Sequence, residues 1–232
     1  MVTRSAVHAM PPLETVARET MAGQVYQQLR EAIMSGRFAP GQPLSLRSVA
    51  DAVGSSTMPV RGALMKLQAE GALVEGPGRA LMVPPMSLEG LEELRDVRIA
   101  LEGCVVERAA ARLTDASFAE IERIYQAMQK RVDANDVAGY LRCNFAFHTA
   151  IYAQGAGDIT LATIQNMWMR IGPFLNLFAL DVTHMQRSMV AHRIIVEALA
   201  RRDGAAAREG IAQDIGDAAQ GLAERLKAQA ER

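Results

Sequence analysis

Four polar side chains in the second half of the sequence could together hold a divalent metal ion. Asn144 and His148 are four residues apart, so they would share one helix face and converge on one point. His192 lies inside the apolar run VAHRIIVEAL, and Asp214 lies among isoleucines and alanines near the C-terminus. In a helical bundle, two imidazoles, an amide oxygen and a carboxylate could line one cavity and bind the metal. The alternative is a polar pocket without metal, in which these groups satisfy one another or a ligand.

Two arginines are further candidates for binding a small ligand. Arg98 and Arg170 each lie in a largely apolar stretch, and the planar guanidinium can engage both oxygens of a carboxylate. The alternative is an ordinary structural role, in which the arginine is exposed or, for Arg98, pairs with Glu102.

A second group of polar residues suits a helix that enters the major groove of DNA. Ser56 and Thr57 can donate to a phosphate or reach base edges, and the start of a helix itself favours a phosphate oxygen. Arg61, one turn further along, can reach a phosphate or the O6/N7 edge of guanine. Arg47 lies where such motifs cross the DNA backbone, and Arg79 could enter the minor groove or hold a phosphate from a hairpin tip.

The elements that would position these DNA-binding residues are predicted in the order of a winged helix. An apolar stripe predicts a helix over residues 20–35, and two shorter helices are expected over 46–53 and 57–70, joined by a Gly-Ser-Ser turn. Apolar runs at 73–75 and 80–83 flank a Gly/Pro turn and predict a β-hairpin.

The remainder of the chain is predicted to be helical, so the expected fold class is mostly α. The predicted helices cover residues 88–112, 115–134, 136–153, 158–180, 184–202 and 204–230. Pro173 is expected to kink or split the fourth of them. The sequence therefore suggests a flexible tail (1–17), a winged helix-turn-helix domain (18–85) and an all-helical domain (86–232).

The bulk composition excludes several classes of protein. The 232 residues are enough for two domains, and the formal net charge of −1 means that any DNA contact must come from a local surface. Cys104 and Cys143 are too few for a disulfide scaffold and form no metal-binding CxxC motif. Neither a signal peptide nor an apolar run long enough for a membrane span is evident, so a cytoplasmic protein without membrane association is expected.

The stretch from Leu29 to Val83 resembles the DNA-binding domain of the GntR family of regulators. The family's LRxxIxxGxxxPG motif is found at 29–41, PVRxAL at 59–64 and LxxEG at 67–71. The resemblance implies DNA contacts by seven residues: Arg47, Ser56, Thr57, Met58, Arg61, Gly78 and Arg79.

This chain departs from the family pattern at three places in that domain. Thr57 stands where arginine is usual, Gly62 stands where glutamate is usual, and the wing reads Gly-Arg-Ala rather than Arg-Gly. Since arginine is a favoured reader of guanine, the operator sequence of the family does not carry over.

The second half resembles the FCD effector domain of the FadR-like branch of that family. The matching motifs are LRDVRIALEGCVVERAAARLT (94–114), CNFAFHTAIY (143–152) and AHRIIVEALARRD (191–203). Many members of the branch bind a metal through an Asp-x3-His pair and two further histidines, and the metal then binds a carboxylate effector. The family pattern also has a pocket arginine near Arg98.

The resemblance implies a metal site, with zinc, nickel or manganese as candidate ions, at the four residues identified above. His148 and His192 match the family pattern, whereas Asn144 replaces the aspartate and Asp214 replaces the last histidine. A neutral amide is a weaker ligand than a carboxylate, so the sequence leaves both a metal site and a metal-free polar pocket open.

These patterns together predict a transcription regulator rather than an enzyme. A homodimeric repressor would bind a palindromic site in double-stranded operator DNA, and a small organic acid would control its affinity. One alternative is a helical domain that only dimerises. Another is a helical-bundle metalloenzyme, but the sequence contains no HExxH motif, no Glu-x-x-His pair and no nucleophile with its base.

Overall fold

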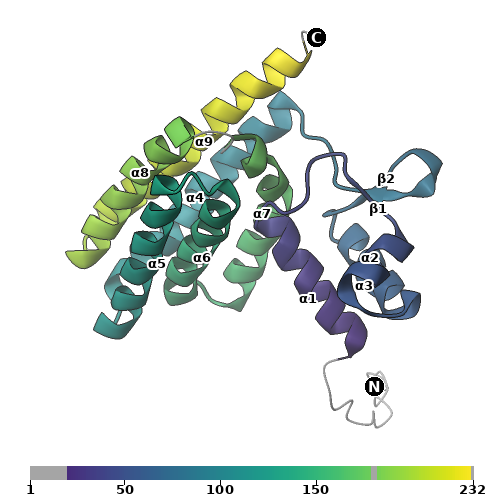
Figure 1. Ribbon diagram of the computed structural model, residues 1–232. Coiled ribbons are helices and arrows are strands. Elements are labelled where there is room, and N and C mark those ends of the chain that lie inside the picture. Colours follow the sequence, from purple (N-terminus) through teal and green to yellow (C-terminus); the bar gives the residue numbers. More distant parts are fainter. Residues whose placement is uncertain (1–19, 179–181, 231–232) are drawn as a thin grey trace, which may run out of the picture.

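The computed structural model of the protein describes residues 20–178 and 182–230, and the predicted tail (1–17) lies outside them (Figure 1). The described chain begins with a small domain of three helices and a hairpin. Its elements are α1 (Met21–Met34), β1 (Pro43–Leu44), α2 (Leu46–Val53), α3 (Thr57–Ala69), β2 (Val74–Glu75), the 3-10 turn η1 (Pro77–Arg79) and β3 (Leu81–Met82).

The helix-turn-helix of α2 and α3 is fixed by local capping and by burial of one face of α3. The Ser45 hydroxyl accepts a hydrogen bond from the Ser48 amide at 3.0 Å, which starts α2. Gly54 ends α2 with φ of 64°, a left-handed conformation that costs glycine little. Val60 and Leu67 are fully buried, so α3 turns its opposite face to solvent.

The wing is a three-stranded antiparallel sheet in the order β1-β3-β2. Met82 of β3 is paired with Pro43 on one side and with Val74 on the other. The hairpin was predicted, but β1 was not, because a strand of two residues is too short to show a period-two pattern.

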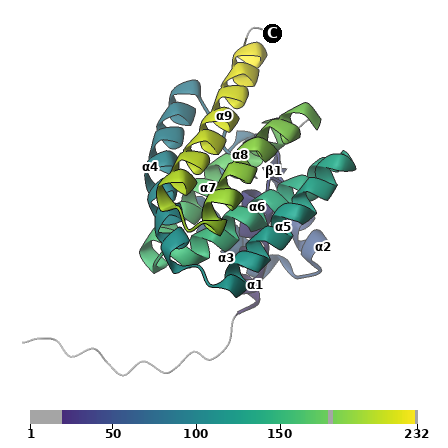
Figure 2. The same ribbon diagram turned by 90° about the vertical axis from the view of Figure 1, so that its left-hand side faces the viewer.

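Six helices follow within the described residues, and the predicted mostly-α fold class is confirmed. They are α4 (Leu88–Arg112), α5 (Asp115–Asp133), α6 (Val137–Gly155), α7 (Asp158–Phe178), α8 (Val182–Ala200) and α9 (Gly204–Ala230). Figure 2 shows α9 lying between α4 and α8, with α5 and α6 beside one another. No helix in the part of the chain that the structure describes could span a membrane.

Of the kink or split expected at Pro173, the split does not occur, because α7 runs unbroken through this residue. Proline removes one backbone donor, but Ile171 and Phe174 on either side of it are buried to 4% and 2% exposure. Packing of these side chains holds the helix together across the missing hydrogen bond.

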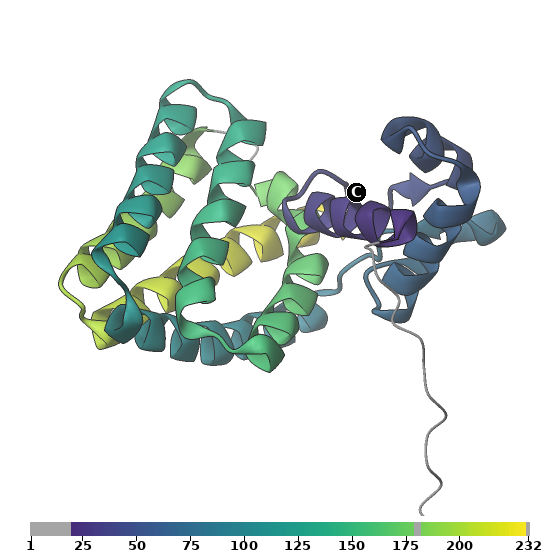
Figure 3. The same cartoon turned by 90° about the horizontal axis from the view of Figure 1, so that it is seen from below.

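Helix α1 lies between the winged helix and the bundle (Figure 3). On one side the Tyr26 hydroxyl donates to the carboxylate of Glu70, just beyond α3, and Lys66 of α3 lies with its Nζ 3.8 Å from the Tyr26 ring centroid. On the other side Arg30 donates from Nη2 to Oε1 of Gln165 in α7 at 2.8 Å. Helix α1 therefore contacts both the rest of the winged helix and the bundle.

Two glycines allow α1 and α7 to approach at backbone distance. A Cβ on Gly172 of α7 would lie 2.5 Å from the carbonyl oxygens of both Ile33 and Met34. Gly36, just after α1, has φ of 72°, and its Cβ would lie 2.9 Å from the Gly172 carbonyl oxygen. Any side chain at either position would push the two helices apart.

We expect Gly172→Ala to destabilise the protein, although alanine normally favours a helix. The new methyl group would overlap backbone atoms that cannot rotate away, at a cost of about 1–3 kcal/mol in the free energy of unfolding. Gly216→Ala in α9 is the matched control, because nothing lies within 4 Å of its Cβ. It should instead stabilise by about 0.5–1 kcal/mol. Urea unfolding measures both variants, and equal effects would contradict the close α1–α7 contact.

Candidate functional site

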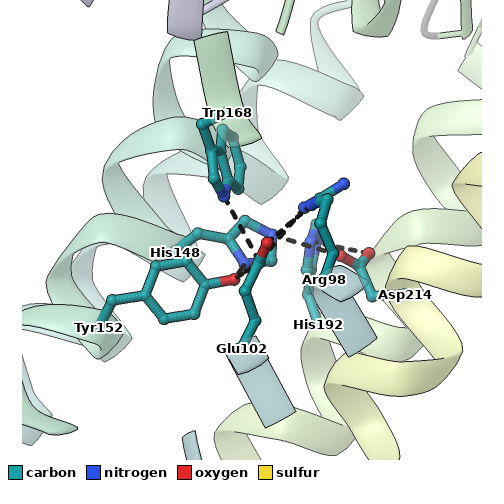
Figure 4. A network of polar contacts seen from close by, with 7 residues as sticks. All are labelled: Arg98, Glu102, His148, Tyr152, Trp168, His192 and Asp214. Atoms are coloured by element: carbon teal, nitrogen blue, oxygen red, sulfur yellow. Dashed lines mark hydrogen bonds and ion pairs between the residues drawn. The ribbon is translucent and has the colours of Figure 1, made fainter. Parts of the chain in front are cut away.

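His148, His192 and Asp214 meet inside the bundle, as the sequence predicts (Figure 4). They come from α6, α8 and α9 respectively. Nε2 of His148 lies 3.3 Å from Oδ2 of Asp214, and Nε2 of His192 lies 3.2 Å from Oδ1 of the same carboxylate. The ligand atoms of the three residues are all within 4.8 Å of one another, and all three side chains are buried. Asn144, one turn before His148, is also buried and lines the same cavity.

The electrostatics of this cluster favour an ionised carboxylate beside a neutral imidazole. Burial by itself raises the pKa of Asp214, but the nearby His192 and His148 together hold it well below its ordinary value. Burial lowers the pKa of His148, and the opposing effect of Asp214 does not fully offset it. Asp214 is therefore negatively charged at neutral pH.

A second buried carboxylate, Glu102 of α4, lies behind His148 and is saturated with donors (Figure 4). Arg98 donates to it from Nε at 2.7 Å and from Nη2 at 3.2 Å. The Tyr152 hydroxyl donates to Oε2, and the indole Nε1 of Trp168 donates to the same oxygen at 3.4 Å. These contacts tie α4, α6 and α7 together around one charge.

Tyr152 determines which nitrogen of His148 carries the proton. Its only hydroxyl hydrogen goes to Glu102, because an ionised carboxylate can only accept. Burial, reinforced by Glu102, raises the pKa of Tyr152 well above its ordinary value, so the hydroxyl stays protonated. The oxygen of Tyr152 then accepts from Nδ1 of His148 at 3.2 Å. Neutral His148 consequently directs the lone pair of Nε2 toward Asp214.

The cluster presents acceptors that face one another without a donor between them. A lone pair on Nε2 of His148, 3.3 Å from an ionised carboxylate oxygen, is favourable only when a proton or a cation lies between them. Both ring nitrogens of the fully buried His192 lack a hydrogen-bond partner, because its 3.2 Å contact with Asp214 is not aligned for one. This is the chemistry of a cation-binding set.

The cavity beside the cluster is small, with a volume of about 30 Å³. Arg98, Trp168, Leu175 and Ser188 are among the residues that line it. This volume accommodates one water molecule or one ion, whereas pockets for organic ligands are about tenfold larger or more. An organic acid can enter only if the walls move.

The two candidate arginines lie in different places. Arg98 is buried, lines the cavity and stacks over Trp168 with its Cζ 5.2 Å from the ring centroid, while it also pairs with Glu102. Arg170 is exposed on another face of α7, and its Nη2 lies 3.2 Å from the point that a Cβ on Gly71 would occupy. The structure thus separates Arg170 from the cavity. The sequence did not indicate this, because an apolar sequence context does not show which helix face a residue occupies.

The residues predicted to contact DNA are all exposed on the winged helix. They are Arg47, Ser56, Thr57, Met58, Arg61, Gly78 and Arg79. Ser56 precedes α3 without capping it through its side chain, so its hydroxyl is free for another acceptor or donor. Gly78 and Arg79 both have positive φ, of 70° and 64°, which forms the tight tip of the wing.

Sequence reasoning missed the roles of Tyr152 and Trp168. Tyr152 is four residues after His148, and Glu102 is four residues after Arg98, so helical spacing could have placed each pair on one face. No local pattern shows that the two faces meet or that Trp168 joins them.

Helix α7 connects the cavity to the winged helix through neighbouring positions on one helix face. Trp168 and Leu175 line the cavity, whereas Gln165 and Gly172 contact α1. A movement of α7 at the cavity would therefore also move the surface that α1 contacts.

Known proteins match both parts of the chain. The FCD domain family matches residues 93–217, and the family of bacterial regulatory proteins called the gntR family matches residues 21–83. The HTH-type transcriptional regulator McbR of Escherichia coli (strain K12) is 27% identical over 206 residues, covering 88% of this chain and 93% of that protein. The gluconate operon transcriptional repressor of Bacillus subtilis (strain 168) is 23% identical over 89% of this chain and 86% of its own length.

A solved structure has a similar fold over most of this chain. The structure of E. coli McbR/YncC superposes with a TM-score of 0.83 at 26% identity, covering 89% of this chain and 99% of that one.

We expect Tyr152→Phe to disturb the site without changing its shape. Loss of the hydroxyl removes a donor from Glu102 and leaves Nδ1 of His148 without an acceptor, at a cost of about 1–3 kcal/mol in the free energy of unfolding. Urea unfolding measures the cost, and ¹⁵N NMR of the imidazole shows whether the Nδ1–H form of His148 is lost.

Tyr125→Phe is the matched control, because Tyr125 is only partly buried and contacts Phe147 through its ring. Its stability should change by less than about 0.5 kcal/mol. An unchanged stability and an unchanged His148 tautomer in Tyr152→Phe would contradict the assigned role of the hydroxyl.

Proposed function

The chain belongs to the gntR family of bacterial regulatory proteins and carries an FCD domain, and on this premise we propose that a small carboxylate effector and a divalent metal control its affinity for operator DNA. The protein is a DNA-binding transcription regulator, and its relatives include named repressors. The observation that carries the proposal is the convergence of His148, His192 and Asp214 on one buried point.

The residues of the site fit a divalent cation. Two imidazole nitrogens and a carboxylate face one another, His192 has no hydrogen-bond partner, and Tyr152 holds His148 in the tautomer that leaves Nε2 free to ligate. Asn144 would supply an amide oxygen as a further ligand, and zinc, nickel or manganese suits such a set of ligands. A bound metal would supply positive charge for a carboxylate.

A carboxylate effector is supported by Arg98 in the cavity wall. Its Nε and Nη2 donate to Glu102, so Nη1 is the nitrogen left to donate to an acid. The guanidinium stays charged because the pairing with Glu102 more than offsets the effect of burial on its pKa. One relative is named for the gluconate operon, and gluconate is a carboxylate.

Effector binding would act on DNA affinity through α7. The cavity of about 30 Å³ must widen to admit an acid, and the side chains of Trp168 and Leu175 form part of its wall. Because α7 contacts α1 at Gly172, widening shifts the support of the winged helix. The effector controls DNA binding only to the extent that it prefers the widened arrangement.

Residues 18–85 would then form the DNA-binding domain and residues 86–232 the domain that binds the effector and dimerises. A homodimer places two α3 helices on a palindromic operator in the cytoplasm, where Arg47, Arg61 and Arg79 contact phosphates and base edges. A repressor of this kind occludes a promoter until its effector changes the arrangement of the two domains.

We expect zinc, nickel or manganese to stabilise protein that has been treated with a chelator, and an organic acid to stabilise it further only when metal is present. At a hundredfold excess over its Kd, a ligand of the folded state contributes about 2.7 kcal/mol. Melting temperature measures the effect with gluconate among a panel of acids. The fluorescence of Trp168, the single tryptophan, is a second readout, because its ring lies 5.2 Å from that of His148.

Two histidines on α8 provide the variants for this experiment. His192→Ala should abolish the metal response, and His184→Ala should retain it, since His184 lies outside the three-residue cluster. Equal stabilisation by an acid with and without metal would show a metal-free polar pocket. Stabilisation by neither metal nor acid would leave a helical domain that only dimerises.

For the DNA-binding half, we expect Arg61→Ala to weaken operator binding by about 1–3 kcal/mol, or roughly fivefold to 150-fold. Arg61 is exposed on α3, so circular dichroism should stay unchanged. Gel shifts on duplexes selected from a random pool measure binding, with Arg112→Ala at the end of α4 as a charge-matched control. Unchanged specific binding by Arg61→Ala would contradict the assignment of α3 as the recognition helix.

A further inference from the structure

The solvent-facing side of α3 carries little charge for a helix that enters the major groove. Opposite its buried residues, the helix exposes Thr57, Met58, Arg61, Met65 and Gln68. Arg61 is the one charged residue on this side, because the other cation of α3, Lys66, extends over the ring of Tyr26. Met58 is 76% exposed and Met65 is 61% exposed, so both present thioether side chains directly to solvent.

Met58 lies at the N-terminal end of α3. It is the second residue of α3, and helical side chains tilt toward the N-terminal end of their helix. In helix-turn-helix proteins the N-terminal residues of the second helix contact base edges. Met65 lies two turns further along, about 10 Å down the helix axis. If α3 enters the groove with its N-terminal end, Met58 therefore lies nearer the bases than Met65 does.

We propose that Met58 reads the 5-methyl group of a thymine in each operator half-site. This proposal rests on the DNA-binding function and names what α3 recognises. The thymine methyl is the one apolar group that base pairs present in the major groove, and a flexible, polarisable thioether can pack against it. The neighbouring Thr57 has a short side chain where an arginine would hydrogen-bond guanine. At this end of α3, apolar contact between Met58 and the thymine methyl would therefore replace that hydrogen bond.

The surroundings of Met58 favour DNA as the occupant over a second protein surface. Ser56 and Thr57 before it and Arg61 one turn after it are exposed groups that can contact phosphates and base edges. The Ser56 side chain is not used to cap the helix, and the start of α3 attracts a phosphate. The apolar side chain is thus framed by groups that suit nucleic acid.

Replacing thymine with deoxyuridine tests the proposal, because only the methyl group is removed. Binding sites are first selected from a random duplex pool with the full chain, and each thymine of the selected half-site is then replaced singly. We expect the wild-type protein to lose about fourfold in affinity at one thymine per half-site, the value of one buried methyl group. Met58→Ala should bind the thymine and uracil duplexes equally, whereas Met58→Leu should keep the preference.

Met65→Ala is the matched control and should discriminate thymine from uracil as the wild type does. Because Met58 is exposed, Met58→Ala should keep the wild-type melting temperature. The proposal is overturned if the wild-type protein is insensitive to every replacement, or if Met58→Ala still prefers thymine. In either case, specific binding to the selected sites would show that the DNA-binding function stands. Failure to select any sequence would overturn both.

Discussion

Two carboxylates, Glu102 and Asp214, lie inside the bundle, and each must be compensated because removing a charge from water costs several kcal/mol. Glu102 is compensated fully by Arg98, Tyr152 and Trp168, which brings α4, α6 and α7 to one point. Asp214 has only the imidazoles of α6 and α8: Nε2 of His148 presents a lone pair to it, and His192 is not aligned to donate to it. The charge of Glu102 is thus fully compensated by neighbouring donors, whereas the charge of Asp214 is not. A cation would fit beside Asp214.

Glu102 is linked to the winged helix through α7, because this helix supplies Trp168 as a donor and also contacts α1. Trp168 donates to Glu102, stacks beneath Arg98 and forms part of the cavity wall. One turn later Gly172 meets the backbone of α1 with no room for even a methyl group. Close-packed interiors do not deform gradually, so a ligand that enlarges a cavity of about 30 Å³ must move some of the helices that line it, and α7 is one of them. The small size of the cavity is consistent with control by an effector, since a ligand that fits without movement would transmit nothing.

The parts of this architecture that follow from local chemistry were predictable from the sequence. Apolar periodicity and caps such as Ser45 and Gly54 set the helix ends, and polar residues inside apolar helices, such as His148 and His192, have to meet in a bundle. Features that depend on the orientation of one element against another were not predictable. The face of Arg170, the strand β1 and the three donors around Glu102 depend on contacts between distant segments. The contact between Gly36 and Gly172 has no sequence pattern at all, because it is a property of two backbones.

A count of charges narrows the class of effector that the proposed metal site could accept. A divalent cation beside Asp214 would leave one positive charge, because Asn144 is neutral and Arg98 is already balanced by Glu102. One carboxylate would neutralise that charge, and a buried site is least costly when its charges cancel. A second carboxylate would have to draw Arg98 away from Glu102, leaving that buried carboxylate with only Tyr152 and Trp168 as donors. The arrangement therefore favours an acid with a single carboxylate, whose remaining atoms would occupy the space opened between Trp168 and Leu175.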